Sequence, residues 1–174
     1  MSTAQRNGLV RMQGNPITLL GPALNVGDLA PAFRVVDGAF RPVSLEDFRG
    51  RPCLISSVPS LDTSVCVLVT KRFNDELAAW PDPDLAAMTI SMDLPFAQKR
   101  FCEAEHVDRI RILSDHVWRE FGRRYGVLIK DLGLLARAVF IIGRDGRIAY
   151  IEIVPEISDV PDYDAALNAL RAIS

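Results

Sequence analysis

Residues 53–66 read CLISSVPSLDTSVC, and this stretch leads from a short apolar run into a helical pattern. The run from Cys53 to Val58 is apolar without alternation, which is typical of a central strand buried on both faces of a sheet. A helix is predicted from Thr63 to Trp80. Its apolar face consists of Cys66, Val69, Phe73, Leu77 and Trp80. The spacing therefore predicts a strand, a loop and a helix, with Cys66 in the first turn of the helix.

Short strands and helices continue to alternate on the C-terminal side of this unit. Strands are expected over residues 85–91 and 110–113, and a helix over 95–105, where Pro95 suits a first turn. Ser114 or Asp115 can cap a third helix, which is expected to run to Gly126. Such alternation predicts parallel strands joined by crossover helices.

Two hairpins are expected on either side of the alternating region. Apolar runs over 9–12 and 17–20 flank four turn residues, and a strand is expected over 33–36. Strands over 138–142 and 148–153 are joined by Arg144-Asp145-Gly146, a hairpin signal, and a final helix follows over 162–173. The sequence predicts one α/β domain over residues 1–174. Its central mixed β-sheet is flanked by helices in a thioredoxin-like arrangement, with an N-terminal β-hairpin.

Composition and charge exclude several classes of partner. The 174 residues are 49% hydrophobic and 24% charged, as in soluble globular proteins, and the formal net charge is −2. No basic stretch is dense enough for nucleic acid, and no apolar run is long enough to span a membrane. Residues 1–16 lack the apolar segment of a secretory signal. A cytoplasmic location is therefore expected.

Few residues are available for metal binding or structural disulfides. Three cysteines are an odd, small number, which argues against a disulfide framework. The chain has no Cys-x-x-Cys pair, and its two histidines, His106 and His116, lie ten residues apart. No metal site is expected, and the histidines are interpreted as exposed polar positions near helix ends.

Cys66 is the main candidate for chemistry. In the first turn of a helix, free backbone N–H groups and the positive end of the helix dipole favour a thiolate. Thr63 can cap the helix or hold an incoming oxygen near the sulfur, and Pro59 closes the other side of the loop. Cys66 also lies on an apolar face, where a free cysteine is often a small buried hydrophobe. The residues alone leave both interpretations open.

Three further residues are ambiguous. Cys102 lies one position away from the expected core face of the 95–105 helix, so it is a partly accessible thiol or a tolerated boundary residue. That core face is expected to consist of Ala97, Phe101 and Ala104. Cys53 opens the central strand and is interpreted as structural, because burial raises the pKa of a thiol and blocks access. Arg137 is either a solvated strand end or a positive charge that reaches the loop before Cys66.

Several segments resemble one protein family. Pro59-x-x-x-Thr63-x-x-Cys66 is similar to the active-site motif of the peroxiredoxins. The resemblance to the bacterial thiol peroxidase subfamily rests on SLDT (60–63), ISMDLPFAQ (90–98), RFC (100–102), LSD (113–115), YGV (125–127), LARA (135–138) and PDY (161–163). The N-terminal hairpin and VGDLAPAF (26–33) fit as well, so the resemblance spans nearly the whole chain.

This resemblance implies a peroxiredoxin fold and a thiol-dependent peroxidase for hydrogen peroxide and organic hydroperoxides. It implies that Cys66 is the peroxidatic cysteine and Cys102 the resolving one, and that Pro59, Thr63 and Arg137 match the other active-site positions. The family uses no metal or organic cofactor, forms homodimers and is usually reduced by thioredoxin. In this scheme the sulfenic acid on Cys66 condenses with Cys102 to an intrachain disulfide.

Formation of that disulfide requires a local change of structure. The two Cα atoms must come within about 7 Å, whereas the two cysteines lie on separate predicted helices. The first turn after Thr63 and part of the 95–105 helix are therefore expected to unwind during turnover.

The chain departs from the family pattern after each of these cysteines. Val67-Leu68-Val69 is apolar where the family usually has small or polar residues, and Glu103-Ala104-Glu105-His106 replaces the common Gly-Ala-Glu-Gly. Nearby carboxylates disfavour a Cys102 thiolate, so the second departure bears on the speed of resolution. The alternatives are a one-cysteine peroxidase in which Cys102 does not resolve, a thiol-based redox sensor, and a non-catalytic interaction module. The last has no need of Thr63 and Arg137.

Overall fold

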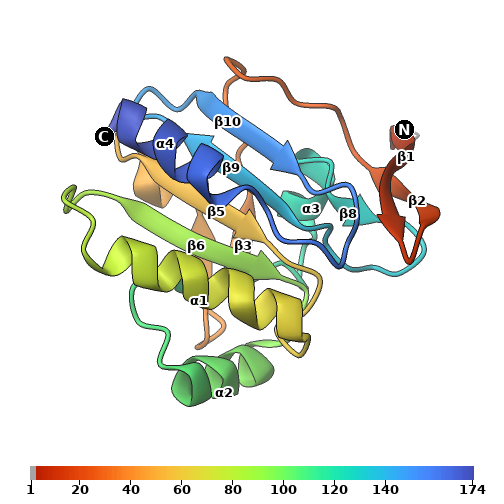
Figure 1. Ribbon diagram of the computed structural model, residues 1–174, viewed down its shortest axis with the longest axis horizontal. Coiled ribbons are helices and arrows are strands. Elements are labelled where there is room, and N and C mark those ends of the chain that lie inside the picture. The colour runs from red at the N-terminus through yellow and green to blue at the C-terminus, as the bar shows by residue number, and fades with distance from the viewer. Residues whose placement is uncertain (1–2) are drawn as a thin grey trace.

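The computed structural model describes residues 3–174, and their order of elements follows the alternation predicted from the sequence (Figure 1). The elements are β1 (Gln5–Met12), β2 (Asn15–Leu20), β3 (Arg34–Val36), β4 (Pro42–Ser44), the 3-10 helix η1 (Leu45–Phe48), β5 (Cys53–Ser57), α1 (Ser64–Ala78), β6 (Ala86–Ser91), α2 (Pro95–Glu105), β7 (Arg111–Ser114), α3 (Glu120–Arg124), β8 (Leu128–Ile129), β9 (Ala138–Ile142), β10 (Ile148–Ile153) and α4 (Tyr163–Ile173).

The central sheet has the strand order β10-β9-β5-β6-β7-β3-β4. β5, β6 and β7 run parallel, as expected for strands joined by crossover helices, whereas β9 pairs with β5 and β3 with β7 in antiparallel fashion. The prediction of a mixed sheet flanked by helices is confirmed. The register places Ser57, at the end of β5, opposite Ala138, at the start of β9.

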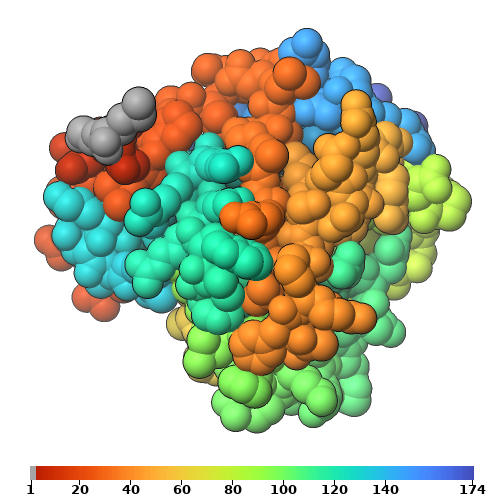
Figure 2. All heavy atoms as spheres, turned by 180° about the vertical axis from the view of Figure 1, so that it is seen from behind, coloured from red at the N-terminus to blue at the C-terminus, as the bar shows by residue number. Residues whose placement is uncertain are grey.

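Both faces of the sheet are covered, so the central strands are buried on each side. Leu54 of β5 packs into a cluster with Phe73 of α1 and Leu167 of α4, and both helices lie in front of the sheet (Figure 1). The next residue, Ile55, belongs to the opposite cluster, which includes Phe121 of α3. Residues from the 25–50 and 115–130 regions cover that second face, which Figure 2 shows from behind. This two-sided burial explains why the run in β5 lacks polar alternation.

The N-terminal hairpin is confirmed and extends further than predicted. Met12 pairs with Asn15, which leaves Gln13 and Gly14 as a two-residue turn with φ values of +50° and +79°. Positive φ at both central positions is the geometry of a tight hairpin turn. β2 pairs in turn with β8, a two-residue strand that the sequence did not predict.

The third helix starts later than predicted. α3 begins at Glu120 and not directly after Asp115, because residues 116–118 form a turn and Arg119 adopts a left-handed φ of +55°. The buried carboxylate of Asp115 still accepts hydrogen bonds from the N–H groups of Phe121 and Gly122, at 3.1 and 2.8 Å. Asp115 therefore satisfies the donors at the start of the helix from five residues before it. No helix in the described residues is both long and apolar enough to cross a membrane.

Candidate active site

Cys66 lies where the sequence predicts it, in the first turn of α1. β5 ends at Ser57, residues 58–63 form the active-site loop, and Ser64 is the first residue of the helix. Backbone N–H groups in a first turn have no acceptor inside the helix, and the helix dipole is positive there. The side chain of Cys66 is fully buried. Val58 and Pro59, which open the loop, are buried as well, whereas Thr63 and Ser64 at the start of the helix are exposed.

Arg137 is a buried neighbour of Cys66 and not a solvated strand end. It directly precedes β9, and the pairing of β9 with β5 brings it beside the active-site loop. Its side chain is 2% exposed, and its Nη1 lies 3.5 Å from the Cys66 Sγ. Nη2 donates to the carbonyl of Ile157 at 2.9 Å, which orients the guanidinium. The Nε is buried as well and finds no acceptor within residues 3–174.

Thr63 is the N-cap residue of α1 by its backbone, with φ −106° and ψ 143°. Its exposed side chain does not cap the helix within the part of the chain that the structure describes, contrary to one of the two predicted roles. The hydroxyl instead donates to the carbonyl of Ser60 at 3.0 Å. Because a hydroxyl has one proton and two acceptor lone pairs, the oxygen can still accept a hydrogen bond from a ligand.

Asp93 anchors the active-site loop, and the sequence analysis did not single it out. Its Oδ1 accepts from the hydroxyl of Ser60 at 2.7 Å, and its Oδ2 from the N–H of Leu61 at 2.8 Å. Ser91 at the end of β6 also donates to Oδ2, at 2.8 Å. The one signal for this residue was its place in the segment ISMDLPFAQ, which matches the family pattern.

Cys102 lies on α2 and is partly buried, as predicted, but the core face of α2 is a different one. Pro95, Gln98 and Phe101 are buried, whereas Ala104 is exposed, because the Gln98 amide finds partners inside the protein. Cys102 packs against the cluster that contains Cys66, and both thiols are free. The structure thus places Cys66 beside Arg137 and the active-site loop, whereas Cys102 lies on a separate, intact helix.

The pKa of Cys102 is raised, with burial as the main cause and the charge of Glu103 as a further one. The second nearby carboxylate, Glu105, pairs with Lys71 of α1 at 3.0 Å. Burial therefore raises the pKa of Cys102 more than the nearby carboxylates do, although the sequence pointed only to the carboxylates.

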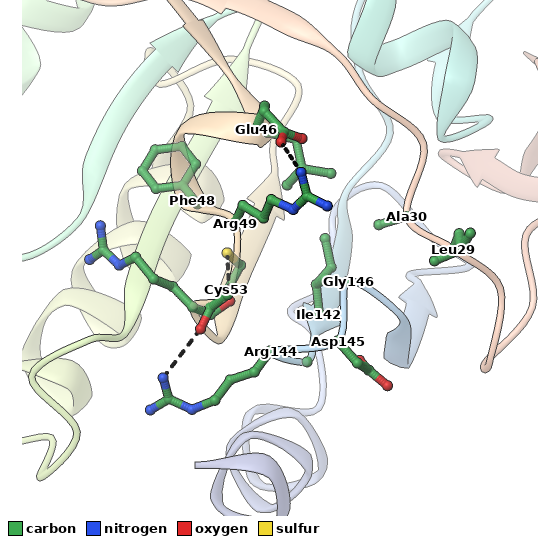
Figure 3. A pocket seen from close by; sticks show the side chains of 14 residues that line it. Leu29, Ala30, Glu46, Phe48, Arg49, Cys53, Ile142, Arg144, Asp145 and Gly146 are labelled. Atoms are coloured by element: carbon green, nitrogen blue, oxygen red, sulfur yellow. Dashed lines mark hydrogen bonds and ion pairs between the residues drawn. The ribbon is translucent and has the colours of Figure 1, made fainter.

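Cys53 lies at the other end of β5, against a cavity of about 330 Å³ (Figure 3). The cavity lies between residues 45–53 and the β9–β10 turn, and the dashed line from the sulfur in Figure 3 marks a 3.5 Å contact with the Arg51 carbonyl. Burial raises the pKa of Cys53 to about 11. Neither Cys66 nor Arg137 lines this cavity, so it is separate from the candidate site.

The two histidines differ in exposure. His106 is exposed at the C-terminus of α2, as predicted. His116 is half-buried, because its Nδ1 lies 2.7 Å from the hydroxyl of Ser114. Among residues 3–174, no three His, Cys, Asp or Glu side chains are grouped closely enough to hold a metal ion.

Known proteins are similar to this chain over most of its length. The family model described as Redoxin matches residues 25–167. The thiol peroxidase of Listeria innocua is 48% identical over 162 residues, which cover 93% of this chain and 97% of that protein. The thiol peroxidase of Staphylococcus epidermidis is 44% identical over 164 residues, or 94% and 98% of the two chains. The crystal structure of a peroxiredoxin-like protein from Aquifex aeolicus has 42% identity and a TM-score of 0.90 over 100% of both chains.

Proposed function

The chain belongs to the redoxin family and is a thiol-dependent peroxidase, and from this premise we propose that Cys66 is the thiol that attacks the hydroperoxide. We place Arg137, Thr63 and Pro59 in the site around it. One observation carries the assignment: the buried guanidinium of Arg137 lies 3.5 Å from the Cys66 Sγ, in the first turn of α1. A binding module or a buried structural cysteine has no use for that uncompensated charge.

In the first step, the Cys66 thiolate attacks one peroxide oxygen and the O–O bond breaks. Cys66 becomes a sulfenic acid, and the departing alkoxide or hydroxide takes a proton and leaves as alcohol or water. Fixed donors lower the barrier, because negative charge develops on the departing oxygen. Arg137 supplies its positive charge, and its Nη1 lies beside the sulfur. The Thr63 oxygen orients the peroxide by accepting its O–H, because its own proton is bound to the carbonyl of Ser60.

In the second step, the thiol of Cys102 attacks the sulfenic sulfur, an S–S bond forms and water leaves. Both cysteines start on intact helices, so the first turn of α1 and part of α2 must unwind for the two sulfurs to meet. An oxidised structure that keeps both helices intact contradicts this step. An external dithiol then reduces the disulfide by exchange.

A one-cysteine peroxidase is the second candidate. It is favoured by the raised pKa of Cys102, which keeps the resolving thiol protonated and slows its attack. Its partly buried position on a regular helix acts in the same direction.

The remaining features follow from the family. We propose hydrogen peroxide and organic hydroperoxides as substrates, a thioredoxin-like protein as reductant, a homodimer in the cytoplasm, and no metal or organic cofactor. Light scattering on the purified chain tests the dimer, and turnover with thioredoxin against a small dithiol tests the reductant.

Counting thiols tests the central proposal. Free thiols are titrated before and after one equivalent of hydroperoxide, in the wild type and in Cys102→Ser. Loss of two thiols in the wild type without intermolecular linkage supports the two-cysteine enzyme. Loss of one thiol favours the one-cysteine enzyme. A chain that reacts but does not turn over with any dithiol is a redox sensor, and no fast reaction at Cys66 refutes the peroxidase mechanism.

A further inference from the structure

One carboxylate, that of Asp93, connects the segments that carry the two cysteines. Asp93 lies between β6 and α2, two residues before α2 begins at Pro95. On the side of Cys66, it binds the hydroxyl of Ser60 and the N–H of Leu61, at 2.7 and 2.8 Å. Both residues belong to the active-site loop that leads into α1. Hydrogen bonds to a carboxylate are stronger than those between neutral groups, so these two bonds stabilise the position of the loop.

Asp93 is also hydrogen-bonded to residues at the ends of β6 and β7. Its carbonyl accepts from the hydroxyl of Ser114 in β7, at 2.6 Å. Ser91, which donates to the carboxylate, accepts in turn from the side-chain amide of Gln98 at 3.1 Å. Gln98 is 1% exposed and also donates to the carbonyl of Leu113 at 2.8 Å. Asp93 is therefore part of a frame built from the ends of β6 and β7 and the first turns of α2.

Cys102 is attached to the same frame through α2. Gln98 precedes Cys102 by four residues, so the two side chains lie on the same face of the helix, one turn apart. At its other end α2 is tied to the middle of α1, where Lys71 pairs with Glu105 at 3.0 Å. α1 and α2 accordingly lie side by side (Figure 1). The bonds of Asp93 join the frame to the loop at the reactive end of α1.

We propose that Asp93 is a positioning residue that acts on the two chemical steps in opposite directions. Its bonds to Ser60 and Leu61 hold the active-site loop in the conformation that reacts with peroxide. The same bonds must break before Cys66 can leave its site and meet Cys102. The proposal rests on the proposed function, since it assigns Asp93 a role in both the oxidation of Cys66 and the formation of the disulfide.

Asp93→Asn tests this, because it keeps the shape of the side chain and turns one acceptor oxygen into a donor. Ser60→Ala is a milder variant that removes one of the loop's two hydrogen bonds to Asp93, together with the bond that the Ser60 hydroxyl accepts from the N–H of Asp62. Asp62→Asn is the matched control, since Asp62 is an exposed carboxylate in the same loop that accepts no hydrogen bond from residues 3–174. Each substitution is made in the full chain, and thermal unfolding reports whether the variant folds.

The two steps are measured separately. Oxidation of Cys66 by hydrogen peroxide is followed in a Cys102→Ser background, with a sulfenic-acid trap and mass spectrometry. Disulfide formation is followed with both cysteines present, by rapid alkylation after one equivalent of hydrogen peroxide. We expect Asp93→Asn to slow the first step about tenfold and to accelerate the second about tenfold, the change that corresponds to one charge-assisted hydrogen bond. Ser60→Ala should shift both rates in the same directions by less, and Asp62→Asn should shift neither.

Two results overturn the proposal. Either both rates stay unchanged in Asp93→Asn, or both fall by the same factor, as a purely structural role requires. If Asp93→Asn does not fold, the rates of Ser60→Ala decide by the same criteria. A wild-type chain whose Cys66 is not oxidised in the first assay overturns the proposed function itself, before any Asp93 variant is compared.

Discussion

Two buried cysteines lie near opposite ends of β5, and the groups around their sulfur atoms differ. Cys53 opens the strand at 1% exposure, and Cys66 follows its far end at 0%. The Cys53 sulfur faces the Arg51 carbonyl, and burial raises its pKa to about 11. The Cys66 sulfur faces the guanidinium of Arg137. Burial by itself keeps a thiol protonated, so the difference lies in the donors around the sulfur.

Arginines are present near both sulfurs, but they differ in their partners and in their contact with the sulfur. Arg51 donates its Nε to the carbonyl of Asp84, and Arg144 is paired with Asp82 and Asp84. Arg137 has no carboxylate partner within residues 3–174, and its Nε has no acceptor there. The charge of Arg51 lowers the pKa of Cys53, but burial outweighs it, and the Cys53 sulfur contacts the carbonyl of Arg51 and not its guanidinium. Direct contact between guanidinium and sulfur therefore distinguishes the surroundings of Cys66 from those of Cys53.

Exchange of each cysteine tests the comparison most directly. Cys66→Ser should abolish peroxide consumption, because it removes the thiol whose sulfur contacts the guanidinium of Arg137. Cys53→Ser should keep the wild-type rate. Both variants are assayed for consumption of hydrogen peroxide with excess dithiol. Residual turnover in Cys66→Ser that disappears in the double variant would show that Cys53 also reacts.

Removal of the cation should have the next largest effect. Arg137→Met is expected to slow the oxidation of Cys66 about 100-fold, since loss of one fixed donor to a developing oxyanion costs at least that much. Stopped-flow measurement of the second-order rate constant checks this in a Cys102→Ser background. Arg144→Met, which removes a paired arginine beside the Cys53 cavity, is the matched control and should leave the rate unchanged. Equal rates in the two variants would remove the distinction between the two arginines.

Thr63 supplies a hydroxyl at the start of the helix that carries Cys66. Thr63→Val keeps the shape of the side chain and removes the acceptor, so the oxidation of Cys66 should slow about tenfold, the cost of one hydrogen bond to the peroxide. Thr63→Ser keeps the hydroxyl and should retain most of the rate. The same stopped-flow assay measures both. A Thr63→Val variant as fast as the wild type would limit Thr63 to a structural role.

The smallest effect concerns pH and stability at Cys53. Its pKa is raised from 9.0 to about 11, so the folded protein favours the neutral thiol. The resulting stabilisation is fully present below pH 9 and is lost as the pH rises to 11. At 1.36 kcal/mol per pKa unit, it amounts to at most about 3 kcal/mol. Urea unfolding of the wild type and Cys53→Ala, in the presence of reductant, should give free energies that converge across this range. Parallel curves would show that Cys53 does not titrate between folded and unfolded states as described.

The sequence determined many of the local elements of this protein and the position of Cys66, the candidate nucleophile. β9, β10 and α2 have the predicted bounds, and Cys66 lies in the first turn of its helix as expected. These features depend on periodicity, on Pro95 at a helix start and on the break before Thr63, all of which act between neighbours in the chain. The late start of α3 differs from the prediction, because residues 116–118 form a turn and Arg119 adopts a left-handed backbone before the helix begins.

Only the tertiary structure decided which side chains meet at the sulfur. The sequence left Arg137 undecided between solvent and the site, and the register of β5 with β9 placed it beside Cys66. The sequence analysis did not single out Asp93, whose carboxylate accepts a hydrogen bond from Ser60, 33 residues earlier in the chain. It misassigned the buried face of α2, because a glutamine counts as polar until its buried partners are known. Strand pairing between distant segments sets these distances, and local propensity carries no information about them.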